Sequence, residues 1–346
     1  MKSSSLKDFG HGDQYGKLKH FHPDLVDFSS SINPLTISLS STFNSHTVNH
    51  YPSIEEGAEK IISDELGIPQ SHIVIFAGMT PLIHSIFDIE NIKDVLLIEP
   101  LFSEYRKASW IRNCNITRLS LDVVRKNPQL LVDFRFDIVC INNPVNPTGE
   151  YISRRTIFKI AEIAQSKGAF LFLDEAYIDF LPDKIRYDTT ELVEMYPRVI
   201  LGRTFTKITG LPGIRLGFAI ASKTVASKIR ELRPPWTIPE DAIQFLLSVL
   251  HAKPDASLPD QIVYLKKKLM ELGFTLIGDS SVNMLSFDMG EQLDPDIFYN
   301  KLIEKGFLIR PLGNFYGFNN RSFRISVRRT MENEALVKAM GEIING

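Results

Sequence analysis

The stretch AFLFLDEAY, residues 169–177, is the strongest single indication of the fold. Its five leading apolar residues are typical of a strand that is buried on both faces, and such strands belong to parallel sheets covered by helices. The run ends at Asp174, so a carboxylate lies at the carboxyl end of the strand, where open α/β sheets bind ligands. The sequence therefore predicts an α/β protein with a binding site at Asp174.

Similar short apolar runs recur along the first two thirds of the chain, with helical patterns between them. We expect strands near residues 73–76, 95–99, 116–119, 138–141, 170–173, 199–202 and 214–220. Helices are expected to begin near Ser53, Pro81, Ser103, Ser153 and Thr189, because serine and threonine are common N-caps. This alternation predicts a three-layer domain over residues 35–235, built on a mostly parallel seven-stranded sheet.

A second, smaller domain is expected after the proline-rich stretch RPPWTIP, residues 233–239, which interrupts any helix. Beyond it, helical patterns at residues 241–251, 260–272 and 296–305 alternate with strand patterns at residues 284–287, 307–310 and 322–327. These patterns predict an α+β domain over residues 236–346. Residues 1–34 have little periodicity and are interpreted as an N-terminal arm.

Composition excludes several classes of protein. The net charge of -2 over 346 residues provides no basic field for nucleic acid. Cys114 and Cys140 are too few for a disulfide framework or a zinc site, and His20 and His22 lack a third ligand nearby, so no metal site is expected. Residues 1–16 lack the apolar core of a signal peptide, and no apolar run reaches the ~18 residues of a membrane span. We expect a cytoplasmic protein without membrane contact.

The stretch TFTK, residues 204–207, follows the strand predicted at residues 199–202 and presents a lysine at the same edge of the sheet as Asp174. A Schiff base requires such an amine, held near a carbonyl and readily deprotonated. Arg215 can bind a phosphate with the hydroxyls of Thr204 and Thr206. Lys207 beside a phosphate site predicts pyridoxal 5'-phosphate as the cofactor.

Other residues fit the same cofactor. A protonated pyridine nitrogen would neutralise the buried Asp174, and Tyr177 lies close enough in sequence to reach the ring hydroxyl. The prolines of NPVNPTG, residues 143–149, stiffen a turn that aims the Asn146 amide at one place. Phe102 can stack on the ring. The strand-to-helix turn at Gly78, Met79 and Thr80 offers backbone N–H groups to a phosphate.

Each of these residues, taken alone, also fits a structural role. Asp174 can begin a helix, Lys207 can be a solvated loop lysine, and Arg215 can form a surface ion pair. Phe102 fits an ordinary core position, and the turn after residue 76 is a common one. The cofactor prediction depends on their occurring together at strand ends of one sheet.

The motifs at residues 143–149, 174–177 and 204–217 resemble, in order and spacing, the signature of class I and II aminotransferases, the fold-type I pyridoxal phosphate enzymes. The resemblance extends over almost the whole chain. It implies a Schiff base on Lys207 and catalytic roles for Asp174 and Tyr177. The cofactor contacts that it implies are Asp174 at the ring nitrogen, Asn146 and Tyr177 at the ring oxygen, and Thr204, Thr206 and Arg215 at the phosphate.

The resemblance also implies a homodimer in which Tyr51 reaches the cofactor phosphate of the partner. Arg324 would bind the substrate carboxylate through two hydrogen bonds. Within the family, the stretches at residues 11–13 and 27–34 look most like threonine-phosphate decarboxylases of cobalamin synthesis, and then like histidinol-phosphate aminotransferases. Both groups act on phosphorylated amines. The implied substrate-binding residues are His11, Asn33, Arg310 and Arg324.

Three functions remain open at this point. The first is decarboxylation of L-threonine-O-3-phosphate or a similar substrate, although Asp13 stands where the decarboxylase pattern usually has glycine, and its charge would repel a phosphate. The second is amino transfer from a histidinol-phosphate-type substrate to 2-oxoglutarate. The third is a non-catalytic sensor that binds pyridoxal phosphate. Such a sensor would have an added DNA-binding domain, and residues 1–34 are too short to form one.

Overall fold

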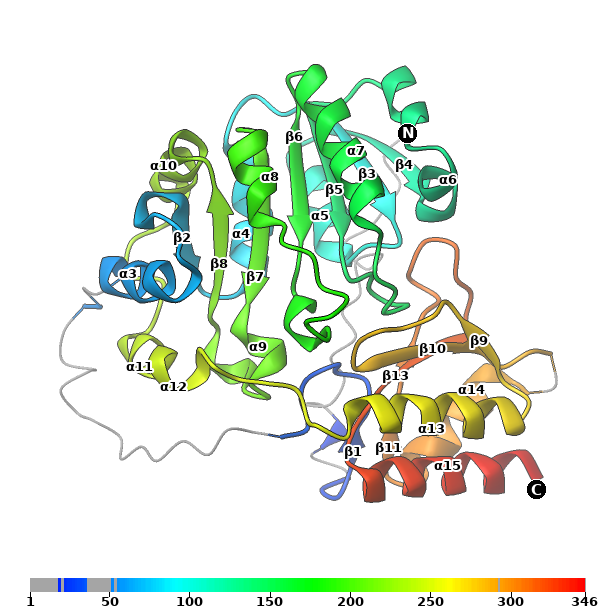
Figure 1. Cartoon of the computed structure of the whole chain (residues 1–346). Helices are drawn as coiled ribbons and strands as arrows, with labels where there is room; N and C mark the ends of the chain where they lie inside the picture. Colours follow the sequence, from blue (N-terminus) through cyan, green and yellow to red (C-terminus); the bar gives the residue numbers. More distant parts are fainter. Residues whose placement is uncertain (1–17, 20–21, 36–50, 53–54, 292, 346) are drawn as a thin grey trace.

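The computed structural model describes residues 18–19, 22–35, 51–52, 55–291 and 293–345, and its larger domain is built on a seven-stranded sheet (Figure 1). The strand order is β2-β8-β7-β6-β5-β3-β4, and β8 runs antiparallel to both of its neighbours while the other pairs are parallel. The strands are β2 (Ile73–Phe76), β3 (Asp94–Glu99), β4 (Asn115–Ser120), β5 (Ile138–Asn142), β6 (Phe170–Asp174), β7 (Val199–Thr204) and β8 (Gly217–Ala221). The predicted α/β fold with a mostly parallel sheet is confirmed.

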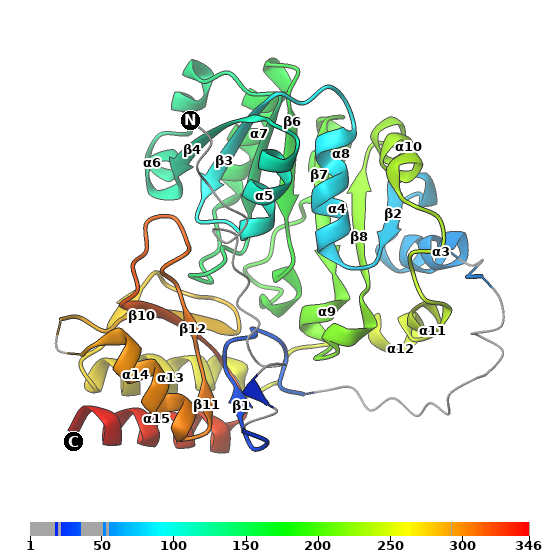
Figure 2. The ribbon, with the colours of Figure 1, turned by 180° about the vertical axis from the view of Figure 1, so that it is seen from behind.

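Helices cover both faces of this sheet, because successive strand residues point to opposite sides and both sides are apolar. Leu171 packs into one core and Phe172 into the other. One face is covered by α4 (Met79–Ser85), α5 (Ser103–Ile111) and α10 (Lys223–Leu232), as Figure 2 shows from behind. The opposite face is covered by α3 (Glu55–Leu66), α6 (Leu121–Lys126), α7 (Arg154–Ser166), α8 (Thr190–Met195), α11 (Glu240–Gln244) and α12 (Leu246–Val249).

The smaller domain contains a four-stranded antiparallel sheet of order β12-β13-β10-β9. Its strands are β9 (Thr275–Ile277), β10 (Met284–Asp288), β12 (Arg310–Pro311) and β13 (Ser322–Ser326). Three helices share its core, namely α13 (Leu258–Glu271), α14 (Pro295–Glu304) and α15 (Thr330–Asn345). Part of the expected arm joins this domain, because β1 (Val26–Asp27) pairs in parallel with β11 (Phe307–Leu308).

Several boundaries differ from the sequence expectations. The strand expected over residues 214–220 begins at Gly217, because Pro212–Ile214 form a 3-10 turn and Arg215 adopts a left-handed conformation with φ 56°. The strand expected over residues 307–310 divides into β11 and β12, which belong to different sheets. The helix expected over residues 241–251 is the pair α11 and α12.

The passage between the domains also lies later than expected. Ile238, Ala242 and Leu246 pack in the core of the larger domain, so the chain enters the smaller domain after α12 rather than at residue 236. Of the expected helix starts, Ser103 and Ser153 are confirmed, and the Ser153 hydroxyl accepts a hydrogen bond from the backbone N–H of Thr156. Ser53 lies outside the described residues. None of the helices in the described ranges is long and apolar enough to cross a membrane.

Candidate active site

A cavity of about 340 Å³ lies where the two domains meet, and its volume falls within the range of small-molecule sites. Its walls come from the carboxyl ends of β6 and β7, the starts of α4 and α5, and the strands β12 and β13. Twelve of the predicted site residues line it: Met79, Thr80, Phe102, Asn146, Asp174, Tyr177, Thr204, Thr206, Lys207, Arg215, Arg310 and Arg324.

Asp174 is the last residue of β6, and its carboxylate is 7% exposed. One carboxylate oxygen accepts a hydrogen bond from the Tyr105 hydroxyl at 2.6 Å, and the other accepts one from the backbone N–H of Ala176 at 2.9 Å. Burial raises the pKa of Asp174, and the hydrogen bond from Tyr105 opposes this shift. Within the described residues, no cation forms an ion pair with this carboxylate. A protonated ring nitrogen would supply the missing positive charge, so the site fits pyridoxal phosphate.

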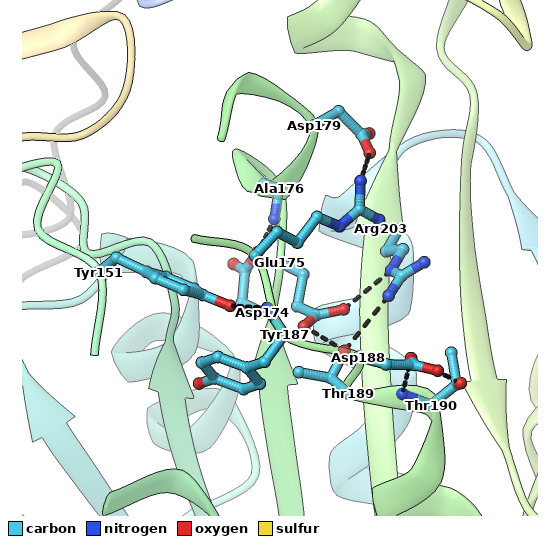
Figure 3. A network of polar contacts seen from close by, with 11 residues as sticks. Tyr151, Asp174, Glu175, Ala176, Asp179, Tyr187, Asp188, Thr189, Thr190 and Arg203 are labelled. Carbon is cyan, nitrogen blue, oxygen red and sulfur yellow. Dashed lines mark hydrogen bonds and ion pairs between the residues drawn. The ribbon is translucent and has the colours of Figure 1, made fainter. Parts of the chain in front are cut away.

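Glu175, the next residue, does not line the cavity and belongs to a polar network with Arg203 and Thr189 (Figure 3). Its carboxylate accepts hydrogen bonds from Arg203 Nε at 2.8 Å and from the Thr189 hydroxyl at 2.6 Å. Adjacent carboxylates at this strand end therefore have different environments. Asp174 faces the cavity, whereas Glu175 is paired with a buried guanidinium.

Lys207 lies on the short helix α9 (Phe205–Ile208), which begins directly after β7. Its Nζ is 5.6 Å from the centre of the Tyr177 ring and lines the same cavity as Asp174. The Thr204 hydroxyl caps α9 by accepting from the backbone N–H of Thr206, and it donates to the Leu216 carbonyl. Lys207 forms no ion pair with any carboxylate in the described part of the chain, which leaves its amine available for a carbonyl group.

The opposite end of the cavity has a cationic group held close to the start of α4. The left-handed backbone of Arg215 brings its guanidinium over Gly78, where a Cβ atom would lie 2.6 Å from Nη2. Gly78 has φ 85°, a conformation that favours glycine. The guanidinium thus lies beside Thr80 and the first backbone N–H groups of α4, an arrangement that suits a phosphate.

Two further guanidinium groups enter the cavity from the smaller domain. Arg310 of β12 lies directly opposite Arg324 of β13 in the antiparallel register. Arg324 donates from Nη1 to the Asn146 amide oxygen at 2.5 Å and from Nη2 to the Ser29 carbonyl at 2.8 Å. Arg310 donates to the Asn314 amide oxygen at 3.0 Å. Neither guanidinium forms an ion pair with a carboxylate among the residues that the structure describes.

This pair of arginines is electrostatically unfavourable without a ligand, because like charges directly opposite on neighbouring strands repel. Burial lowers the pKa of Arg310 to about 10, and the charge of Arg324 adds to this effect. Burial also lowers the pKa of Arg324. A ligand with two anionic groups would neutralise both side chains.

Among the predicted site residues that the structure describes, three do not line the cavity, namely Gly78, Asn33 and Tyr51. The amide nitrogen of Asn33 donates to the carbonyls of Ile208 and Lys253, so this side chain anchors the N-terminal segment beside α9. Tyr51 is 73% exposed, and its ring lies 4.6 Å from that of Trp236 outside the cavity. His11 lies outside the described residues.

The structure adds cavity residues that the motifs did not predict. Ser29 and Ser30 come from the segment interpreted as an arm, although its DFSSSINP stretch was a usable signal. Phe315 comes from a loop without a motif, and its ring lies 5.6 Å from the Arg310 guanidinium. Tyr105, which touches Asp174, has the spacing of a core aromatic on α5, so no local pattern could reveal it.

Comparison with known proteins agrees with this geometry. The sequence profile of the family described as "Aminotransferase class I and II" matches residues 44–343. The chain is 26% identical to threonine-phosphate decarboxylase from Salmonella typhimurium, over 94% of this chain and 93% of that protein. It is 27% identical to histidinol-phosphate aminotransferase 2 from Archaeoglobus fulgidus, over 86% of this chain and 85% of that protein.

The fold is also that of a solved structure, histidinol-phosphate aminotransferase from Sinorhizobium meliloti in complex with pyridoxal-5'-phosphate. The TM-score is 0.78 at 18% identity, and the similarity covers 100% of this chain and 98% of that chain. At this identity the comparison concerns the fold alone.

Proposed function

The chain belongs to the class I and II aminotransferase family, and on that premise we propose that it decarboxylates a small phosphorylated amino acid of the L-threonine-O-3-phosphate type. The family depends on pyridoxal phosphate, so this protein is a pyridoxal-phosphate-dependent enzyme. The proposal concerns the substrate and the reaction. It rests above all on Arg310 and Arg324, two guanidinium groups in the cavity that contains Lys207 which form no ion pair with a described carboxylate.

In this proposal the substrate has two anionic groups. Arg324 binds its carboxylate, because Asn146 and the Ser29 carbonyl already hold the guanidinium in one orientation. Arg310 binds its phosphate, with Asn314 holding the guanidinium. The substrate amine then lies between these anchors and Lys207, and a fixed geometry of this kind lowers the entropic cost of reaction.

The residues proposed to hold the cofactor are those that the sequence predicted. Asp174 and Tyr177 face the ring, Phe102 covers it, and Arg215 with Thr206 binds the phosphate. When bound, the cofactor supplies a carbonyl carbon for amines and a conjugated ring that withdraws electrons from the substrate Cα. Lys207 is proposed to donate and accept protons at the substrate, since its amine has no competing carboxylate among the described residues.

Amino transfer is the alternative reaction, because Arg310 would bind the phosphate of an amine of the histidinol-phosphate type in the same way, and Arg324 would then bind a carboxylate of 2-oxoglutarate. Decarboxylation is favoured because a substrate with both a carboxylate and a phosphate would neutralise Arg324 and Arg310 together. A purely sensory role, the third alternative, would leave Lys207, which forms no ion pair with a described carboxylate, without a function in proton transfer.

We further propose that the enzyme is a homodimer of the cytoplasm. Tyr51 and Trp236 form an exposed aromatic pair outside the cavity, which suits contact with a second copy. If Tyr51 binds the cofactor phosphate of the partner, mixing Tyr51→Phe with Lys207→Ala chains should restore part of the activity that each lacks. Sedimentation measures the dimer, and cell fractionation measures the location.

The deciding experiment uses the purified protein supplied with pyridoxal phosphate. Wild-type protein should acquire a visible absorbance that Lys207→Ala abolishes, and it should release CO2 from phosphothreonine without a keto acid. Amino transfer from histidinol phosphate to 2-oxoglutarate would instead establish the alternative. A protein that takes up no cofactor would overturn both assignments, and one that binds cofactor but converts neither substrate would favour the sensor.

A further inference from the structure

The two strands that carry the cofactor-facing residues are joined behind the cavity by a buried ion pair. Glu175 immediately follows Asp174 at the end of β6, and Arg203 immediately precedes Thr204 at the end of β7. The Glu175 carboxylate accepts from Arg203 Nε at 2.8 Å, and the backbone N–H of Glu175 donates to the Gly202 carbonyl at 2.8 Å. One side chain of each adjacent pair thus lines the cavity, and its neighbour belongs to the rear network (Figure 3).

A third side chain, Thr189, contacts both members of the Glu175–Arg203 ion pair. The Thr189 hydroxyl donates to Glu175 and accepts from Arg203 Nη2 at 3.2 Å. Thr189 stands at the N-cap position of α8, but its side chain makes no capping hydrogen bond there. Its hydroxyl is therefore used by the ion pair instead of the helix. All three side chains are buried, so each charge depends on the other for compensation.

We propose that the Glu175–Arg203 pair is a positioning and charge-balancing device for Asp174, which keeps that carboxylate ionised toward the cofactor ring. The inference rests on the proposed cofactor contact of Asp174. Arg203 neutralises the one carboxylate adjacent to Asp174, and the same contact fixes the end of β6 against the end of β7. Neither residue lies at the reacting atoms, so both act through Asp174 and the Thr204–Lys207 segment.

The charges around this site determine the direction of the expected effects. Besides Glu175, the groups that face Asp174 are Tyr105 from α5, Cys140 from β5 and Lys207 from α9. The charge of Glu175 raises the pKa of Asp174, whereas Lys207 lowers it. Without Arg203 the charge of Glu175 would act on Asp174 uncompensated.

The remaining neighbours belong to the rear network. Tyr151 from the loop before α7 and Tyr187 from the segment before α8 face Glu175. Burial raises the pKa of both hydroxyls, and the charge of Glu175 adds to this shift. Burial disfavours the charged form of Arg203, but the charges of Glu175, Asp179 and Asp188, which face it, together raise its pKa. None of these side chains lines the cavity. A change in the rear pair is therefore expected to reach the cofactor through Asp174.

The test compares Arg203→Gln, Glu175→Gln and the double variant in the full-length protein. Affinity for pyridoxal phosphate is measured by equilibrium titration across a pH series, together with the absorbance of the bound cofactor. Ionised Asp174 favours binding, so affinity falls as the pH drops through the pKa of Asp174. Arg203→Gln should move this midpoint upward by roughly one pH unit, which corresponds to about tenfold weaker binding at the acidic end.

Glu175→Gln should move the midpoint in the opposite direction, because it removes the Glu175 charge, which raises the pKa of Asp174, and leaves the positive charge of Arg203 in place. The double variant, which has neither charge, should return close to the wild-type midpoint. This reversal of sign is the distinguishing result, since a merely structural contact would weaken binding in both single variants. If Arg203→Gln fails to fold, the Glu175→Gln and double variants still test the proposal.

Glu59 and Arg233 provide a matched control, because they form a buried ion pair at 3.0 Å between α3 and the segment after α10, away from the cavity. Arg233→Gln and Glu59→Gln should lower thermal stability and leave the pH midpoint unchanged. Midpoints that stay at the wild-type value in the Glu175 and Arg203 variants would overturn this inference. A wild-type protein that binds no cofactor would instead overturn the proposed function.

Discussion

Arg310→Gln is expected to stabilise the cofactor-free protein and to weaken binding of the phosphorylated substrate. Burial and the neighbouring Arg324 lower the pKa of Arg310 from its ordinary value to about 10. A lowered pKa means that folding disfavours the charged form, and this cost is fully present at neutral pH and disappears only as the pH rises above about 10. The difference corresponds to roughly 3 kcal/mol. Residual solvent screening reduces the expected gain in unfolding free energy to about 1–2 kcal/mol.

The same substitution removes a charge-assisted contact worth about 1.5–3 kcal/mol. The kcat/KM for phosphothreonine should therefore fall about 10- to 150-fold, while that for unphosphorylated threonine should change little. Thermal unfolding of the cofactor-free protein and steady-state kinetics on both substrates measure the two effects, with the exposed Arg329→Gln as control. A variant that is less stable and equally active on both substrates would refute the assignment of Arg310 to the substrate phosphate.

Gly202→Ala should weaken cofactor binding about tenfold, because the new Cβ would lie 2.5 Å from the Met79 methyl carbon and push the Met79 side chain into the cavity. Equilibrium titration with pyridoxal phosphate measures the change in affinity. In the cofactor-free protein the buried Asp174 has a raised pKa, so its contribution to stability is lost as the pH rises through that pKa. Asp174→Asn should remove this loss and equal or exceed wild-type stability at pH 7, and a lower melting temperature in cofactor-free Asp174→Asn would contradict this. Tyr316→Leu should raise the KM of phosphothreonine about 2- to 5-fold, whereas Tyr316→Phe should not. The Arg118 guanidinium lies 4.2 Å from the centre of the Tyr316 ring, and this contact joins the loop after β12, the strand of Arg310, to the larger domain. Equal KM values for the two variants would argue against that contact.

The local sequence pattern was sufficient to predict the strands of the larger domain. The apolar runs at residues 73–76, 95–99, 138–141, 170–173 and 199–202 are typical of buried strands, and the carboxyl ends of parallel strands meet at one edge of the sheet. For this reason Lys207, Asp174, Asn146 and Arg215 were all predicted before any distance was known, and all four line one cavity.

Predictions were poorer where contacts between distant segments override local preference. Residues 307–310 read as one strand, but pairing with Val26 and with Phe323 assigns its halves to different sheets. Ile238 and Leu246 read as the start of a second domain, but the nearest apolar surface belongs to the first. Burial against a remote partner leaves no periodic signal of its own, so such assignments need the assembled core.

By itself, the sequence determined the fold class, the cofactor and a set of residues that line one cavity, because backbone period and side-chain chemistry are local properties. Only the tertiary structure decided which charges are compensated. In the tertiary structure Arg310 lies opposite Arg324 on the neighbouring strand, Tyr105 donates a hydrogen bond to Asp174, and Arg203 forms an ion pair with Glu175. Electrostatic energy depends on distance and burial, and neither can be read along the chain.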